Sequence, residues 1–299
     1  MRRIKINSFF DIKKNLDTLN ITDIAEFFIL YESVNTGITK EDVINKMEQV
    51  LLVMRDSVKI GRQDYNTTHS GMIFGGAKKM SQFSESGKSL LSKEFSDVIV
   101  NSLSVSEANA CMKKIVAAPT AGAAGVIPGA IFKIADKHNV TDEELVNALF
   151  VAGGIGEVIL KKASISGAVH GCQAETGSAS AMTAGAIAYL FNKDIDIIES
   201  AASFALKNVL GLVCDPVAGL VEIPCIKRNV SAALNAIAAA EMALAGIKTV
   251  IPFDEIVLAM AEIGNQMSYT LKETALGGIA GSPMGKNIAT DLYKQTLSD

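Results

Sequence analysis

Apolar residues recur along this chain at the three- and four-residue spacing that places them on one face of a helix. One such run, Val43–Met54, follows Thr39 and Asp42, which form a variant of the helix-capping box. A second run begins after Thr141 and Glu144, which show the same three-residue offset. Both patterns predict amphipathic helices that start at a capped residue.

Two later segments also predict helices. Ser231–Gly246 is rich in alanine, and Gly246 is a suitable residue to end the helix. Asp254–Met267 has helical periodicity as well, whereas the sustained period-two alternation of strands is scarce along the chain. We therefore predict an all-α fold, a single large helical domain over residues 1–299 whose small residues let helices pack closely.

Within that domain we predict an N-terminal helical part at residues 1–60 and a core at residues 109–290. Residues 61–86 are polar and contain several glycines, which predicts a loop that is either a surface connection or a lid. The window 115–132 carries no charge and approaches the length of a membrane span. Its prolines and glycines instead favour a buried turn followed by the start of a helix.

The composition narrows the class of protein. The chain has 299 residues, 49% of them hydrophobic, with no tryptophan and a net charge of −4. The charges are dispersed, so no basic patch indicates nucleic-acid binding. No secretory signal is visible, and no glycine-rich stretch has the spacing of a nucleotide-binding loop. We expect the protein to be cytoplasmic. Disulfides are rare in the cytoplasm, so the four cysteines should be free, catalytic or metal-bound.

Three of these cysteines have an unusual setting. Cys172, Cys214 and Cys225 are separated by 41 and ten residues, which is not the C-x-x-C spacing of zinc ribbons. Buried free cysteines are ordinary small hydrophobic residues, so the spacing alone leaves metal binding open. Each of the three nevertheless lies beside glycine or proline and has polar neighbours. Cys111 lies in a plain helical pattern and is predicted to be structural.

Several segments of this chain resemble the alpha subunit of the iron–sulfur-dependent bacterial L-serine dehydratases. The resemblance rests on "APTAGAAGVIPG", "GCQAETGSASAM", "CDPVAGLVEIPCIKRN", "EMALAGIKTVIPFDE" and "LKETALGGIAGSPMGK". It implies an all-helical fold and a [4Fe-4S] cluster held by Cys172, Cys214 and Cys225. It also implies a separate beta subunit that carries the regulatory domains. The chain departs from the family pattern at "THSGMIFGGAKKM" and at "GIAGSPMGK".

The resemblance also implies a reaction and a set of site residues. Three thiolates leave one iron of the cluster open, and an open iron is a Lewis acid that can polarise the hydroxyl of L-serine. Loss of the hydroxyl and the α-proton would give pyruvate and ammonia. Candidate catalytic residues are His170, His69 and Lys272, although the base could also come from the partner chain. Candidate substrate-binding residues are Asn109, Thr120 and Gly122.

Other functions remain open at this point. A related lyase on the same cluster could act on threonine or cysteine, as a threonine dehydratase or a cysteine desulfidase. An electron-transfer protein would normally have a fourth thiolate. A single Zn²⁺ also accepts three cysteines and a water molecule, which would suit a non-catalytic metal-binding helical module.

Overall fold

The computed structural model describes residues 3–63 and 67–296, and these residues form helices joined by turns without any strand. Two isolated bridges, Thr67–Phe74 and Cys214–Lys272, are their only β-type pairings. The prediction of an all-α fold is confirmed. The α-helices are α1 (Phe9–Leu19), α2 (Ile24–Thr36), α3 (Lys40–Gln63), α4 (Gly76–Glu85), α5 (Lys93–Ala110), α6 (Val126–His138), α7 (Asp142–Lys162), α8 (Gly167–His170), α9 (Ser178–Phe191), α10 (Ile195–Lys207), α11 (Cys225–Leu244), α12 (Phe253–Gln266) and α13 (Pro283–Thr296).

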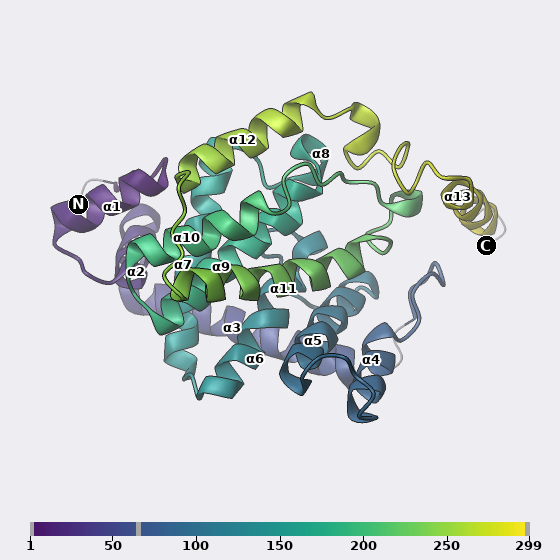
Figure 1. Cartoon of the computed structure of the whole chain (residues 1–299), viewed down its shortest axis with the longest axis horizontal. Coiled ribbons are helices and arrows are strands. Elements are labelled where there is room, and N and C mark those ends of the chain that lie inside the picture. Colours follow the sequence, from purple (N-terminus) through teal and green to yellow (C-terminus); the bar gives the residue numbers. More distant parts are fainter. Residues whose placement is uncertain (1–2, 64–66, 297–299) are drawn as a thin grey trace.

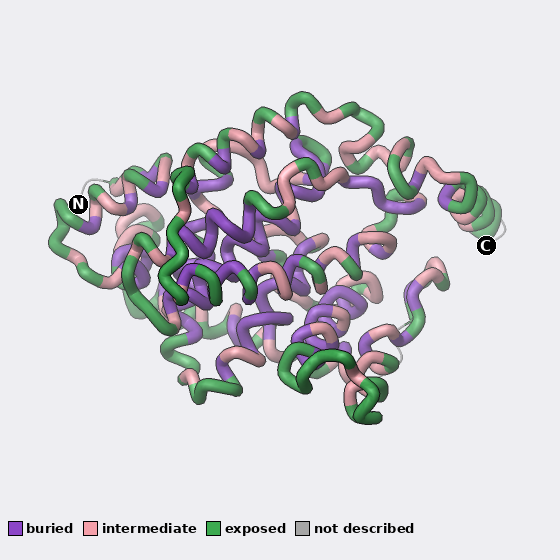
Figure 2. The backbone as a smooth tube through the Cα atoms, viewed as in Figure 1, coloured by how far each residue is buried: buried purple, intermediate pink, exposed green. Residues whose placement is uncertain are grey.

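Helix α9 lies in the middle of the molecule and packs against α6, α7, α10 and α11 (Figure 1). Its sequence, SASAMTAGAIAYLF, is small or apolar around most of its circumference, as expected for a helix surrounded by others. Gly185 shows how close the approach is, because an added Cβ would lie 2.1 Å from Cδ1 of Ile155 on α7. The backbone of α9 is correspondingly buried along almost its whole length (Figure 2).

The N-terminal helices belong to the same core. Phe27 of α2 is fully buried, and Phe9 of α1 makes an edge-to-face contact with Phe253 of α12 at 5.9 Å between ring centroids. Both predicted caps are present. Thr39 accepts a hydrogen bond from the backbone N–H of Asp42, and Thr141 forms a complete capping box at the start of α7.

The predicted loop at residues 61–86 needs correction. Helix α3 continues to Gln63, and α4 occupies Gly76–Glu85, so the described non-helical part of this segment is limited to residues 67–75 and Ser86. Residues 64–66 lie outside the described part of the chain. The start of α4 is held by Glu107, whose carboxylate accepts a hydrogen bond from the backbone N–H of Ala77 at 3.2 Å. This partner lies 30 residues further along the chain, so local sequence does not reveal the helix.

The uncharged window 115–132 forms the buried turn and helix start that its prolines and glycines predict. The Ala118–Pro119 peptide is cis, a short 3₁₀ turn η1 (Ala121–Ala123) follows, and α6 begins at Val126. Among the described helices, none is both long and apolar enough to cross a membrane.

Candidate functional site

Cys172, Cys214 and Cys225 meet at one end of the helical body. All three are free and buried, whereas Cys111 is partly exposed. Burial raises the pKa of the Cys225 thiol to about 12, with further contributions from Cys172 and Glu175. Burial, followed by the charge of Cys172, also raises the pKa of Cys214. Direct contacts join their segments: Glu175, three residues after Cys172, lies 3.9 Å from the Cys214 sulfur, and Arg228, three residues after Cys225, is paired with Asp215 beside Cys214.

Cys172 is placed by an irregular stretch between α8 and α9. Gly171 adopts a φ of +78°, and an added Cβ would lie 2.7 Å from Sδ of Met267, so the turn requires glycine. Residues Gln173–Gly177 then form a π-helical turn, a feature that occurs often at functional sites. The Cys172 sulfur lies 3.3 Å from the hydroxyl of Thr176 in this turn.

Cys214 lies in an extended segment that pairs with residues near Lys272. Its backbone N–H donates to the carbonyl of Leu271 at 2.9 Å, and its carbonyl accepts from the N–H of Glu273 at 2.7 Å. Glu273 has a φ of +63°, an uncommon value for a residue with a side chain. The two chain segments are therefore locked together directly beside the thiol.

Cys225 is the first residue of α11 and follows the cis Ile223–Pro224 peptide. One turn later, the amide nitrogen of Asn229 donates to the carbonyls of Cys225 at 2.9 Å and Gly122 at 2.7 Å. The amide oxygen of Asn229 accepts from the N–H of Gly125 at 2.9 Å. Asn229 thereby joins the start of α11 to the turn that precedes α6.

Glu175 lies in the π-helical turn and connects Cys214 to the turn that precedes α6. Its carboxyl accepts a hydrogen bond from the Thr120 hydroxyl at 2.9 Å and lies 3.9 Å from the Cys214 sulfur. Burial raises the pKa of this carboxyl. An added Cβ on Gly167 would lie 2.8 Å from the Cys214 sulfur and 2.7 Å from Glu175 Oε2. Glycine at position 167 thus lets both groups pack directly against the backbone.

Arg228 and Asp215 hold the segments of Cys214 and Cys225 together. The Arg228 guanidinium lies 2.8 Å from Asp215 Oδ1 and donates to the carbonyl of Val213, also at 2.8 Å. The other Asp215 oxygen accepts from the N–H of Ile279 at 2.7 Å. This buried pair therefore also attaches the segment that leads to α13.

The predicted substrate-binding residues lie at this site, but two of them use their donors internally. Asn109 donates to the carbonyl of Ala121 at 3.0 Å, and the Thr120 hydroxyl donates to Glu175. Gly122 lies against Glu175, since an added Cβ would be 3.3 Å from Oε1. These contacts hold the turn before α6 in place.

The three predicted catalytic residues differ in burial and in their contacts. The His170 ring is buried against α12, with Nε2 3.3 Å from the Asn265 side chain and Gly264 beneath the ring. His69 is exposed on the segment 67–75. Lys272 is half-buried beside Cys214, with which its backbone forms the bridge described above.

The segment 67–75 is attached to the cysteine site at its beginning and middle. The Cys111 thiol donates to the carbonyl of Thr67 at 3.4 Å. Thr68 and Ser70, on either side of His69, each donate a 2.7 Å hydrogen bond to the buried carboxylate of Glu222. Glu222 lies three residues before Cys225, so the segment that carries His69 is fastened to the cysteine-bearing stretch.

Sequence reasoning did not assign roles to Glu175, Asp215, Arg228 or Asn229, although each lies within four residues of one of the three cysteines. Their closeness to the cysteines in sequence was the one signal that could have identified them as site residues. Their partners are distant in sequence: Thr120 is 55 residues from Glu175, Ile279 is 64 residues from Asp215, and Gly125 is 104 residues from Asn229. Chain-distant contacts of this kind cannot be read from local patterns.

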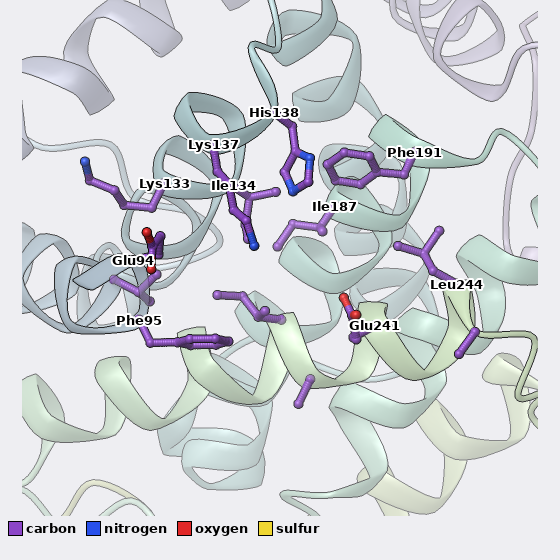
Figure 3. A pocket seen from close by; sticks show the side chains of 14 residues that line it. Glu94, Phe95, Lys133, Ile134, Lys137, His138, Ile187, Phe191, Glu241 and Leu244 are labelled. Atoms are coloured by element: carbon purple, nitrogen blue, oxygen red, sulfur yellow. The ribbon is translucent and has the colours of Figure 1, made fainter. Parts of the chain in front are cut away.

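A cavity of about 620 Å³ lies elsewhere, between α5, α6, α9 and α11. It is lined by Phe95, Ile134, Ile187 and Ile237, and His138 lies beside Phe191 at its edge (Figure 3). The cavity is at the ends of these helices that are remote from the cysteines. On α11, Cys225 and Glu241 are separated by roughly 24 Å along the helix axis. This cavity is therefore separate from the cysteine site.

Soft metal ions and iron–sulfur clusters are bound by cysteine thiolates, and this site supplies three cysteines. Among the described residues, no three His, Cys, Asp or Glu side chains are arranged to hold a single metal ion. A cluster is a larger group whose thiolates bind different iron atoms, so its ligands stand further apart than those around one ion. The donor set and its burial fit a group of that kind.

Comparison with known proteins identifies similar chains. Residues 14–280 match the family described as "Serine dehydratase alpha chain". The "Probable L-serine dehydratase, alpha chain" of Bacillus subtilis is 44% identical over 92% of this chain and 91% of the relative. The "L-serine dehydratase, alpha chain" of Peptoniphilus asaccharolyticus is 42% identical over 89% and 92%. The "L-serine dehydratase" of Streptomyces coelicolor is 36% identical over 84% of this chain but only 56% of the relative.

Proposed function

This chain belongs to the serine dehydratase alpha chain family, and we propose that it catalyses the conversion of L-serine to pyruvate and ammonia. We propose further that Cys172, Cys214 and Cys225 hold a [4Fe-4S] cluster. The observation that carries the proposal is that three buried cysteines stand on separate segments that Glu175 and the Arg228–Asp215 pair join by direct contacts. Arg228, whose charge lowers the pKa of Cys172 and Cys225 against the effect of burial, supplies positive charge beside the thiolates.

With the cluster bound, an iron without a protein thiolate supplies Lewis acidity toward the β-hydroxyl of serine, which is otherwise a poor leaving group. The residues of this chain provide orientation and proton transfer. Asn109, Thr120 and Asn229 hold the turn before α6, and Gly122 and Gly167 let the backbone pack closely against Glu175. Loss of water gives aminoacrylate, which tautomerises to an imine and hydrolyses to pyruvate and ammonia.

His69 is the proposed base for the α-proton. Its imidazole is exposed, and the hydrogen bonds of Thr68 and Ser70 to Glu222 fix its backbone next to the cysteine-bearing stretch. His170 is packed against α12 and is assigned the role of a positioning residue. Lys272 remains a candidate for binding the substrate carboxylate. General-base catalysis typically contributes about 10²- to 10⁴-fold, so His69→Gln should lower kcat within that range while the iron content stays unchanged.

His170→Gln is the matched comparison for the assignment of the base. It should alter iron content or thermal stability more than His69→Gln does, and it should lower kcat less. Exchange of the α-proton of serine with solvent deuterium, followed by NMR, reports on the base directly. Unchanged kcat and exchange in His69→Gln would remove His69 from the mechanism.

The decisive experiment for the function is anaerobic purification of the chain together with its beta chain, the second subunit that we propose. We expect iron, sulfide, cluster absorption and pyruvate formation from L-serine. Threonine and cysteine tested in parallel decide between serine and the related substrates. A colourless protein that contains one zinc ion per chain and forms no pyruvate would contradict the proposal.

Oxygen provides a second test. Activity should disappear in air before the far-ultraviolet circular dichroism changes, and brief exposure should be reversed by ferrous iron with a reductant. Serine should slow the loss. Prolonged exposure should be irreversible because the thiolates themselves are then oxidised. Activity that is indifferent to oxygen and iron chelators would exclude the cluster.

A further inference from the structure

The cavity between α5, α6, α9 and α11 takes no part in the proposed function, yet it has the properties of a small-molecule site. Its volume of about 620 Å³ lies within the range of pockets that bind small ligands, roughly 300–1,000 Å³. Most of its lining is apolar. The apolar residues that line it include Phe95, Val98, Ile187, Phe191, Ile237 and Leu244.

The apolar lining differs in exposure from one part of the cavity to another. Val98, Ile187 and Ile237 are only 2%, 3% and 6% exposed, so they belong to the packed interior. The rings of Phe95 and Phe191 line the same cavity but remain 43% and 42% exposed. A ligand with an apolar body would remove both rings from water, and burial of apolar surface favours association.

Groups of opposite charge enter this cavity from different helices. Lys137 and His138 reach into it from the end of α6, and Glu241 reaches into it from α11 (Figure 3). The His138 ring lies edge-to-face against Phe191, with 4.8 Å between the ring centroids. Among the residues that the structure describes, the side chains of Lys137 and Glu241 form no ion pair or hydrogen bond.

The other two charged residues of the lining already have partners. The Lys133 ammonium lies 3.5 Å from Asp97 Oδ2 and 3.2 Å from Asp136 Oδ2. The Glu94 carboxylate accepts a hydrogen bond from the Ser92 hydroxyl at 2.7 Å. One ammonium and one carboxylate, on α6 and α11, are therefore the charges of the cavity that a ligand can pair with.

We propose that this cavity binds an α-amino acid with a large apolar side chain. The ligand's carboxylate pairs with Lys137, its ammonium pairs with Glu241, and its side chain lies against Phe95 and Phe191. The apolar lining selects an apolar body, and the two opposite charges select a ligand that carries both. A fatty acid would leave Glu241 without a positive partner, and a simple amine would leave Lys137 without a negative one. The inference goes beyond the proposed function, because the cavity is separate from the cysteine site.

Isothermal titration calorimetry of the purified full-length chain tests the selectivity of the cavity. L-Phenylalanine should bind saturably with one site per chain. L-Alanine keeps both charges but lacks the large side chain, so it should bind at least about tenfold more weakly. Phenylpropionate lacks the ammonium and phenethylamine lacks the carboxylate, so each should lose about tenfold in affinity, as expected for one charged hydrogen bond.

Substitutions at the two charged residues locate the ligand. Lys137→Gln and Glu241→Gln should each weaken binding of L-phenylalanine by about tenfold. Both side chains are exposed, so neither substitution should unfold the chain. Glu241→Gln should also bind phenylpropionate at least as tightly as the wild type does, because it removes a like charge. Lys14→Gln on α1 and Glu26→Gln on α2 are matched controls on exposed residues away from the lining, and they should stay within about twofold of the wild type.

Each outcome supports or overturns the inference. No saturable binding of L-phenylalanine by the wild-type chain would overturn it. Equal affinities of the cavity variants and the controls would place the ligand elsewhere and overturn it too. Equal binding of L-phenylalanine, phenylpropionate and phenethylamine would show that the cavity does not recognise both charges, which also contradicts it. The expected order of affinities in a chain that forms no pyruvate would support the amino-acid site while the proposed function failed.

Discussion

Arg228 and Asp215 form an ion pair of 2.8 Å. The pair joins the start of α11, where Cys225 lies, to the segment of Cys214, which lies eleven positions earlier in the chain. Asp215 is almost fully buried and the Arg228 side chain is mostly so. Removal of one partner from a buried pair leaves an uncompensated charge, which typically costs about 3–5 kcal/mol. The pair is thus positioned to control both the stability and the geometry of the cysteine site.

Arg228→Met should therefore lower the free energy of unfolding by about 3–5 kcal/mol, measured by urea denaturation of the metal-free chain. Lys93→Met removes a largely exposed partner of Asp97 and is the control, with an expected effect below about 1 kcal/mol. Equal effects of the two substitutions would show that the Arg228–Asp215 pair contributes no more than a surface ion pair.

Gly167→Ala should reduce iron bound per chain after anaerobic reconstitution, because the added methyl group would lie 2.8 Å from the Cys214 sulfur. Gly153→Ala, in α7, is the control. Nothing lies within 4 Å of an added Cβ at that position, and replacement of glycine inside a helix stabilises by up to about 1 kcal/mol. Full iron loading of Gly167→Ala would show that the close packing of Cys214 against residue 167 is not required.

Cys172→Ser, Cys214→Ser and Cys225→Ser should each abolish activity and reduce the iron content, because each removes one of three proposed ligands. Cys111→Ser should retain most of both, since a serine hydroxyl can also donate to the carbonyl of Thr67. Iron analysis and the pyruvate assay on the four purified variants test the assignment. Loss of iron from the Cys111 variant alone would contradict the assignment of the three ligands.

Asp23 should make the stability of the fold sensitive to acid. Burial by itself would raise its pKa, but hydrogen bonds from Lys193, from the N–H of Ala25 and from Tyr189 outweigh burial and lower it. A lowered folded-state pKa contributes stability that is complete above the ordinary value of 3.8 and is lost as the pH falls through the folded-state pKa.

Asp23→Asn removes this contribution. The variant should be less stable than the wild type at neutral pH, and the difference should shrink as the pH falls below 3.8. Thermal unfolding at a series of pH values measures the effect, with Glu26→Gln on the same helix as a control for the loss of one charge. A stability difference that is constant from pH 7 to strongly acidic pH would contradict the role of Asp23.

Local patterns predicted the helices α3, α7, α11 and α12 and the capped starts of α3 and α7. The capping box at Thr141 and the apolar face that begins at Val43 need only residues within a few positions, because helical periodicity and caps are short-range properties. The prolines and glycines of 115–132 likewise predicted a turn. The start of α4 was missed because its N-terminus is held by Glu107, which lies 30 residues away from Ala77.

The sequence by itself determined the helical class and singled out three cysteines by their neighbours and by the family resemblance. Only the tertiary structure decided that the Glu175 carboxyl meets Thr120 and Cys214 and that His170 packs against α12. It also decided that Thr68, beside His69, donates to Glu222. Such contacts join residues from 39 to 154 positions apart. They depend on how whole helices pack, because the direction of a side chain at a site is set by the backbone that carries it and not by its neighbours in sequence.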